Sequence, residues 1–268
     1  GVWMRGRDDV AERAPIAVAR ALEIIENGVR ANAGLAVTLA GAGDPLRHGA
    51  WEEVVRGARA LGCLAVHVRT DLMCTDDVAS SLLSSGAGVV SVDLMGTTRE
   101  TYRAVMGVDG FELVRGSLVR LLERRGAMAR PGGLPSAWIV PRMTRCDATL
   151  GEVEAFYDHW LTVAGACAID ALPRSMATER VSALPVPPGV RRRMASEAMA
   201  VMCDGRVPLD GHEHGGRGVV GLIEGRSSGD ALAGEIPIGS VGDLFRTLWR
   251  VRQERMPARV AALASRAA

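Results

Sequence analysis

Short apolar runs along the chain alternate with longer stretches in which apolar residues recur every three or four positions. The short runs, typical of buried strands, lie at Leu35–Ala40, Leu64–Val68, Val89–Leu94, Ala137–Val140 and Ala166–Ile169. The longer stretches predict helices near residues 15–29, 51–61, 75–83, 98–106, 111–125 and 149–163. Strands that alternate with helices predict an α/β fold, in which a parallel sheet is open or closes into a partial barrel.

The alternation stops near residue 171. Residues 172–189 are rich in proline and lack a period, so they read as a linker. Beyond it, Asp204 and Gly205 suit a tight turn between strands at 198–203 and 206–209. Ser240 and Asp243 predict the cap of a last helix. The expected domains are therefore 1–171, a linker at 172–189, and a hairpin-plus-helix extension at 190–268.

Helix-start signals accompany several of these stretches. Pro15 suits the first turn of the first helix, because proline lacks the N–H that this turn leaves unpaired. Thr75 is a candidate cap for the short third helix. Thr149 and Glu152 have the spacing of a capping box, in which each side chain bonds the other residue's backbone N–H.

Charge and composition exclude several functions. The 268 residues are 48% hydrophobic with a formal net charge of +1, which gives no footprint for nucleic acid or an acidic membrane surface. Every basic residue is arginine, so Schiff-base and P-loop lysine chemistry is excluded for this chain. No apolar run has the length of a membrane span and no secretory signal is recognisable, so the cytoplasm is the expected compartment.

The five cysteines are scattered. They are Cys63, Cys74, Cys146, Cys167 and Cys203, and none lies in a CxxC or CxxxCxxC spacing. An odd, dispersed set predicts neither a disulfide scaffold nor a local zinc or iron–sulfur ligand set.

The turn after the first strand is the main candidate for chemistry. It reads GAGDPLRH from Gly41 to His48, with two glycines that let a backbone approach a ligand closely. Asp44 contributes a carboxylate at the carboxyl end of a buried strand, where α/β proteins place ligands. A fixed negative charge at this place predicts a cationic ligand group, such as an amino group.

Six segments in order resemble the radical S-adenosylmethionine (SAM) enzymes with a SPASM extension. GAGDPL at Gly41 is similar to their GxGEPL turn, and VRTDL at Val68 to the strand end that usually reads TNG. SVDLMGTTRETYRAVMG at Ser91 and IVPRM at Ile139 resemble the next two strand ends. VMCDGRVPLD at Val201 and LFRTLWRVRQERM at Leu244 resemble the hairpin and closing helix of the extension.

The resemblance implies a partial parallel (β/α) barrel of the radical SAM type with a SPASM-like appendage, and it also implies a ligand. In the family the glycine-rich turn holds the amino group of SAM, which here implies Gly41, Ala42, Gly43 and Asp44. The strand ends at Thr70, Ser91 and Asp93 would face the ribose, and Arg142 would reach the carboxylate.

Two departures from the family pattern bear on mechanism. The family holds a [4Fe–4S] cluster on a CxxxCxxC loop that this chain lacks, and Asp210 stands where the hairpin's cysteine is expected. Thiolates hold such clusters, so no [4Fe–4S] cluster is expected from this chain alone. The leading hypothesis is a pseudoenzyme that serves as a binding or partner subunit in peptide or protein modification.

Two other hypotheses remain. The pattern opens on a helix, so the chain is alternatively a fragment or split form of an active enzyme whose cluster loop lies upstream or on another chain. The third is an unrelated α/β metal-dependent enzyme, with a divalent metal at Asp210, His212 and His214 beside Glu213. Neighbouring ligands of this kind are a weak signal without a distant third one, which disfavours the metal site.

The first strand also predicts a partner. Leu35–Ala40 is apolar on both faces and has no strand before it, so it would form a sheet edge. Natural proteins cover or charge such edges. We therefore expect this edge to be covered by the N-terminal arm, a second copy of the chain, or another protein.

Overall fold

The computed structural model describes residues 14–41, 43–128, 137–172, 177, 180–185, 199–208, 219–223 and 235–236. The chain divides into two compact units. One comprises Gly1–Val10 with Ala33–Leu184, and the other comprises Ala11–Asn32 with Pro185–Ala268. Within the described ranges, no helix is both long and apolar enough to cross a bilayer. The domain boundaries expected above stay a prediction.

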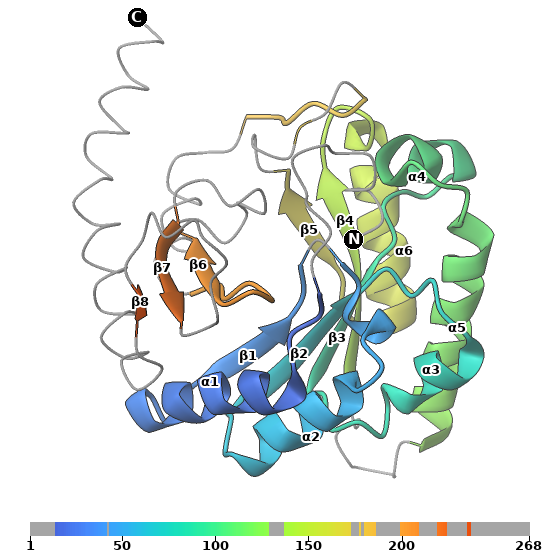
Figure 1. Cartoon of the computed structure of the whole chain (residues 1–268). Coiled ribbons are helices and arrows are strands. Elements are labelled where there is room, and N and C mark those ends of the chain that lie inside the picture. The colour runs from blue at the N-terminus through green and yellow to red at the C-terminus, as the bar shows by residue number, and fades with distance from the viewer. Residues whose placement is uncertain are drawn as a thin grey trace, which may run out of the picture. The chain divides into compact units, whose positions relative to one another are not determined.

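The first unit is built on a five-stranded parallel sheet that curls into a half-barrel, which confirms the expected α/β partial barrel (Figure 1). Its strands follow chain order from edge to edge. They are β1 (Ala36–Leu39), β2 (Ala65–Thr70), β3 (Val89–Asp93), β4 (Trp138–Arg145) and β5 (Ala168–Ala171).

Five α-helices run along one side of this sheet, seen clearly in Figure 1. They are α2 (Trp51–Ala60), α3 (Asp76–Ser81), α4 (Arg99–Met106), α5 (Phe111–Met128) and α6 (Val153–Ala164), with short 3₁₀ turns η2 (Pro45–Arg47) and η3 (Leu150–Glu152). The core lies between the helices and the sheet, where Val66, Val68 and Val90 have no exposed surface. The opposite, concave face of the sheet carries the alternate residues of each strand, and many of these are polar.

Local signals explain where the helices begin and end. Thr98 caps α4, because its side chain accepts a hydrogen bond from Thr101 N. Gly107 and Gly165 close α4 and α6 in the left-handed conformation that glycine adopts without strain. Thr75 occupies the N-cap position of α3 without making a side-chain cap bond.

The capping box expected at Thr149 and Glu152 is wrong. Thr149 makes no side-chain cap bond; its hydroxyl donates to Thr144 O at 2.7 Å and accepts from Cys146 N at 2.9 Å. The Glu152 side chain instead reaches across to the start of α4. A contact between segments about 50 residues apart outcompeted the local one that the sequence spacing predicts.

Strand β4 is twice as long as expected, because it continues through Pro141. Proline removes a ladder hydrogen bond, so it usually argues against an inner strand. Here Arg142 O accepts from the N–H of Leu94, the residue that follows β3. Neighbouring residues of a strand direct their backbone groups to opposite sides, so the backbone of Pro141 faces β5. Pairing with β5 begins only at Arg142, so the missing N–H falls just ahead of the first paired residue.

The second unit contains α1 (Val18–Ala31) and a small sheet of β6 (Arg206–Pro208), β7 (Val219–Ile223) and β8 (Glu235–Ile236). Helix α1 begins three residues after Pro15, which therefore lies outside its first turn. The hairpin expected around Asp204 and Gly205 is formed only in part. Met202 N bonds Arg206 O across the turn, but residues 199–203 form no strand, and β6 pairs with β7 instead. The expected last helix and the loop from Asp210 to His214 lie outside the described residues.

Candidate functional site

The carboxylate of Asp44 ties the first strand's turn to the end of the second strand. One oxygen, Oδ1, caps η2 by accepting from Leu46 N at 2.8 Å. The other, Oδ2, accepts from Thr70 Oγ1 at 2.8 Å and from Asp71 N at 2.5 Å. The turn is therefore fixed at the carboxyl end of the sheet, where its sequence predicted a ligand site.

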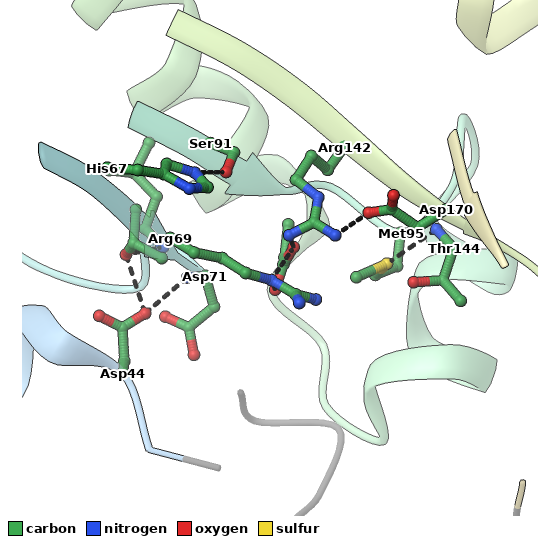
Figure 2. A network of polar contacts seen from close by, with 12 residues as sticks. Asp44, His67, Arg69, Asp71, Ser91, Met95, Arg142, Thr144 and Asp170 are labelled. Carbon is green, nitrogen blue, oxygen red and sulfur yellow. Dashed lines mark hydrogen bonds and ion pairs between the residues drawn. The ribbon is translucent and has the colours of Figure 1, made fainter. Parts of the chain in front are cut away.

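The side chain of Asp71 lies beside that of Asp44 (Figure 2). Asp71 is 2% exposed, and its Oδ1 accepts from Met73 N at 3.0 Å. Its Oδ2 is buried and has no hydrogen-bond partner among the described residues. Burial, followed by the negative charge of Asp71, raises the pKa of Asp44 to about 6. Two carboxylates thus lie side by side in a buried place, and no basic side chain among the described residues forms an ion pair with either of them.

The residue after this pair is held in an unusual conformation. Leu72 has a φ of +53°, in the left-handed region that side chains larger than glycine's rarely adopt. Its side chain is fully buried, and its N–H donates to Thr70 Oγ1 at 2.8 Å. Directly after Asp71 the backbone thus takes a tight turn, within which Asp71 Oδ1 accepts from Met73 N.

A row of charges crosses the concave face of the sheet from β2 to β5 (Figure 2). Nε of Arg69 donates to both carboxylate oxygens of Asp93 at 3.0 Å. Nη1 of Arg142 lies 3.8 Å from Asp93 Oδ1, and its Nη2 pairs with Asp170. Burial and the neighbouring Arg69 lower the pKa of Arg142 to about 10, although Asp93 opposes this shift.

His67 lies on the same face, one pleat before Arg69. Its Nε2 is hydrogen-bonded to Ser91 Oγ, and its Nδ1 lies 3.4 Å from Thr38 Oγ1. Burial, then Arg142, then Arg69 lower the pKa of His67 to about 4, with Asp93 acting in the opposite direction. The imidazole is therefore neutral at physiological pH.

The residues predicted from sequence are distributed over these groups. Gly43, Asp44 and Thr70 lie together at the turn, whereas Ser91, Asp93 and Arg142 belong to the concave face and each has a protein partner. Gly41 has a φ of +149°, a value that favours glycine, and Ala42 lies outside the described residues. The roles expected for these eight residues toward SAM stay predictions.

Sequence reasoning missed Asp71, His67, Arg69 and Asp170 as parts of the site. The sequence contained a usable signal, the alternation of polar and apolar residues, for two of them. His67 and Arg69 alternate with Val66 and Val68, which places polar and charged groups on one face of a strand whose other face is buried. Asp71 and Asp170 carry no such local mark, because their partners come from distant strands.

The described residues contain no group of three histidine, cysteine, aspartate or glutamate side chains placed to hold a metal ion. The cysteines are all free thiols. Cys74, three residues beyond Asp71, has its pKa raised to about 11 by burial and by Asp44, Asp71 and Asp76. Its thiol is therefore protonated at neutral pH and is a poor metal ligand in this state.

No protein-family model matches the sequence, and no curated protein matches it either. Among solved structures, the fold is similar to that of SuiB from Streptococcus suis, with 14% sequence identity and a TM-score of 0.47. The match covers 68% of this chain and 39% of SuiB, so the chain spans about two fifths of that protein.

Proposed function

We propose that this chain is a ligand-binding protein of the radical SAM/SPASM type that performs no radical chemistry of its own. Its ligand is SAM or a close relative, whose amino group binds at Asp44 and Asp71. In this proposal the protein acts as a binding or partner subunit in a peptide or protein modification system. The resemblance of the ordered motifs suggests the class, and the acid pair carries the ligand assignment.

The observation that carries the proposal is a buried pair of carboxylates that forms no ion pair with any basic side chain in the described part of the chain. Burying a carboxylate is costly unless it is paired, so such pairs either take up a proton or receive a cation. Asp44 Oδ1 has accepting capacity left after its bond to Leu46 N, and Asp71 Oδ2 has no partner among the described residues. An ammonium group has three donors and a positive charge, which matches these two oxygens.

The family also implies a cluster, which the residues of this chain do not fit. A [4Fe–4S] cluster on the CxxxCxxC spacing needs three thiolates close together, and the sequence has no such spacing. What this chain contributes in the proposal is orientation: the acid pair would fix the amino group, and the Asp44 tether would fix the acid pair.

Calorimetric titration of the purified protein with S-adenosylhomocysteine tests the ligand assignment, because this compound has the amino group and is chemically stable. Methylthioadenosine, which lacks the amino-acid part, should bind at least roughly tenfold more weakly if a charged hydrogen bond is lost. Asp71→Asn should reduce S-adenosylhomocysteine affinity roughly tenfold and leave methylthioadenosine unchanged.

Asp109→Asn provides the matched control. Asp109 is an exposed carboxylate whose ion-pair partner is Arg99 and which makes no hydrogen bond to Asp44 or Asp71, so this variant should bind both compounds like the parent protein. Equal affinity of the parent for the two compounds would contradict the assignment of the amino group. Failure of both to bind would reject the SAM-type ligand altogether.

The partner role concerns the edge of the sheet. Strand β1 stands at one end of the strand order, and among the described residues it pairs only with β2. Its Ala36 and Thr38 are exposed. We propose that a protein partner or a second copy of the chain adds to this edge, which light scattering of the purified chain would test; a monomer at all concentrations would exclude the second copy.

A further inference from the structure

Arg69 differs from the other paired arginines in how it uses its guanidinium group. It contacts Asp93 through Nε alone, which donates to both carboxylate oxygens. Its terminal nitrogens, Nη1 and Nη2, make no hydrogen bond or ion pair with any described residue. The side chain is 25% exposed, while that of Asp93 is 4% exposed, so the arginine is anchored by a buried group and presents its free end.

Three ion pairs in the same chain show the ordinary arrangement. Arg99 uses Nε and Nη2 on the two oxygens of Asp109. Arg120 uses Nε and Nη2 on Asp76, and Arg206 does the same on Asp204. In each of these pairs a terminal nitrogen is engaged. In Arg69 neither terminal nitrogen is engaged by a described residue. These two nitrogens form the edge of the guanidinium group that binds carboxylate and phosphate oxygens in pairs.

A second guanidinium group, that of Arg142, belongs to the same row of charges. The concave face brings Arg69 and Arg142 together, and their mutual repulsion contributes to lowering the pKa of Arg142. His67 responds to the same field: the two guanidinium groups disfavour its charged form more strongly than Asp93 favours it. The carboxylates of Asp93 and Asp170 balance the two arginines of this row in formal charge.

We propose that Arg69 is an anion-binding residue on the concave face, whose Nη1 and Nη2 bind two oxygens of a carboxylate or phosphate group. Asp93 holds the guanidinium in place through Nε, which lowers the entropy lost on binding. The neutral imidazole of His67 and the hydroxyl of Ser91 flank this face without adding charge. The residues of this site differ from the acid pair of Asp44 and Asp71, and the proposal does not depend on SAM binding at that pair.

The test is a titration of the whole chain, labelled with ¹⁵N-arginine, with inorganic phosphate and separately with acetate, followed by the Arg Nε–Hε signals. The Arg69 signal should shift and saturate with at least one anion. Stronger binding of phosphate would identify a phosphorylated ligand, and stronger binding of acetate would identify a carboxylate. Absence of saturable shifts with both anions overturns the proposal.

Arg69→Gln removes the charge and should weaken anion binding roughly tenfold or more, because hydrogen bonds to charged groups are lost. Arg69→Lys keeps a charge near Asp93 but loses the fork, so it should weaken binding several-fold. The control is Arg56→Gln, which removes an exposed arginine paired with Glu52 on α2 and should leave binding unchanged. Should Arg69→Gln fail to fold, Arg69→Lys decides, and unchanged affinity in that variant overturns the proposal.

Discussion

Two groups of carboxylates in the half-barrel have opposite surroundings. Glu152 accepts from Thr97 N at 2.5 Å, from Thr98 Oγ1 at 3.1 Å and from Thr101 Oγ1 at 2.5 Å. Burial alone would raise its pKa, yet these donors outweigh burial and lower it. The Asp44–Asp71 pair is also well supplied with backbone donors, but the pKa of Asp44 is raised to about 6, because burial and a second carboxylate prevail.

The difference distinguishes Glu152, whose carboxylate has a structural role, from Asp71, whose carboxylate binds a ligand in our proposal. Glu152 accepts hydrogen bonds from the residues at the start of α4, and each of its two carboxylate oxygens has at least one donor. Asp71 leaves Oδ2 buried and without a partner among the described residues. Strongly raised acid pKa values and unpartnered buried polar atoms gather at functional sites, because a site that binds a ligand must be incomplete without it.

The largest effect on stability should come from removing the Glu152 carboxylate, both of whose oxygens have hydrogen-bond donors. Glu152→Ala should lower the free energy of unfolding by about 3 kcal/mol, since it removes several charge-assisted hydrogen bonds and one link between α4 and η3. Urea denaturation at pH 7 measures this. The control is Glu154→Ala, an exposed residue of α6, which should change stability by about 0.5 kcal/mol or less. Equal effects in the two variants would mean that Glu152 is dispensable.

A pH series should distinguish the two groups next. Asp44 has a raised folded pKa, so between about 4 and 6 the folded state holds a proton that the unfolded state has released. Stability should therefore fall by about 2 kcal/mol as pH rises through this window, and then level off. Glu152 has a lowered pKa, so its contribution is present above 4.5 and is lost only at more acidic pH.

Urea denaturation at intervals from pH 4 to 7.5 measures this slope. Asp44→Asn cannot titrate at this position, so its curve should be flatter over the same window. A parent protein whose stability rises from pH 4 to 6 would contradict the raised pKa of Asp44. It would also imply that a cation already neutralises the acid pair.

The smallest effect has the opposite sign. Asp71→Asn should stabilise the protein at pH 7 by about 1 kcal/mol, because it removes a like charge beside Asp44 and puts a neutral amide where an unpartnered carboxylate was. Thermal unfolding measures the gain, and the control is Asp76→Asn, an exposed carboxylate paired with Arg120. A loss in Asp71→Asn larger than that in the control would indicate that the Asp71 charge is already compensated.

Much of the half-barrel follows from its apolar pattern. Strands β1, β2 and β3 lie within two residues of the runs that predicted them, because each run is mostly apolar and bounded by turn residues. Pro141 hid the second half of β4, since its tolerance depends on where β5 begins to pair. The turn at Asp44 could be found from sequence because its glycines and carboxylate are adjacent in the chain.

The rest of the site depends on which strands become neighbours. Asp93 meets Arg69 only because β2 and β3 pair in a register that sets Ser91 against Arg69. The reach of Glu152 to Thr97 likewise spans 55 residues, so local spacing favoured the wrong partner. A buried atom without a partner, such as Asp71 Oδ2, cannot be predicted from sequence, because it depends on which groups the fold places around it.

Leu72 narrows the range of residues that this turn accepts. A left-handed φ at a residue with a side chain is strained by about 1–2 kcal/mol, while the buried leucine side chain repays that by filling the core. Glycine would fit the backbone and leave a hole, and valine or isoleucine would fill space but resist the dihedral angle. Both the backbone angle and the packing of the side chain therefore limit which residues can replace Leu72. A residue that contacts no ligand thus helps to fix the turn that carries the Asp71 carboxyl group.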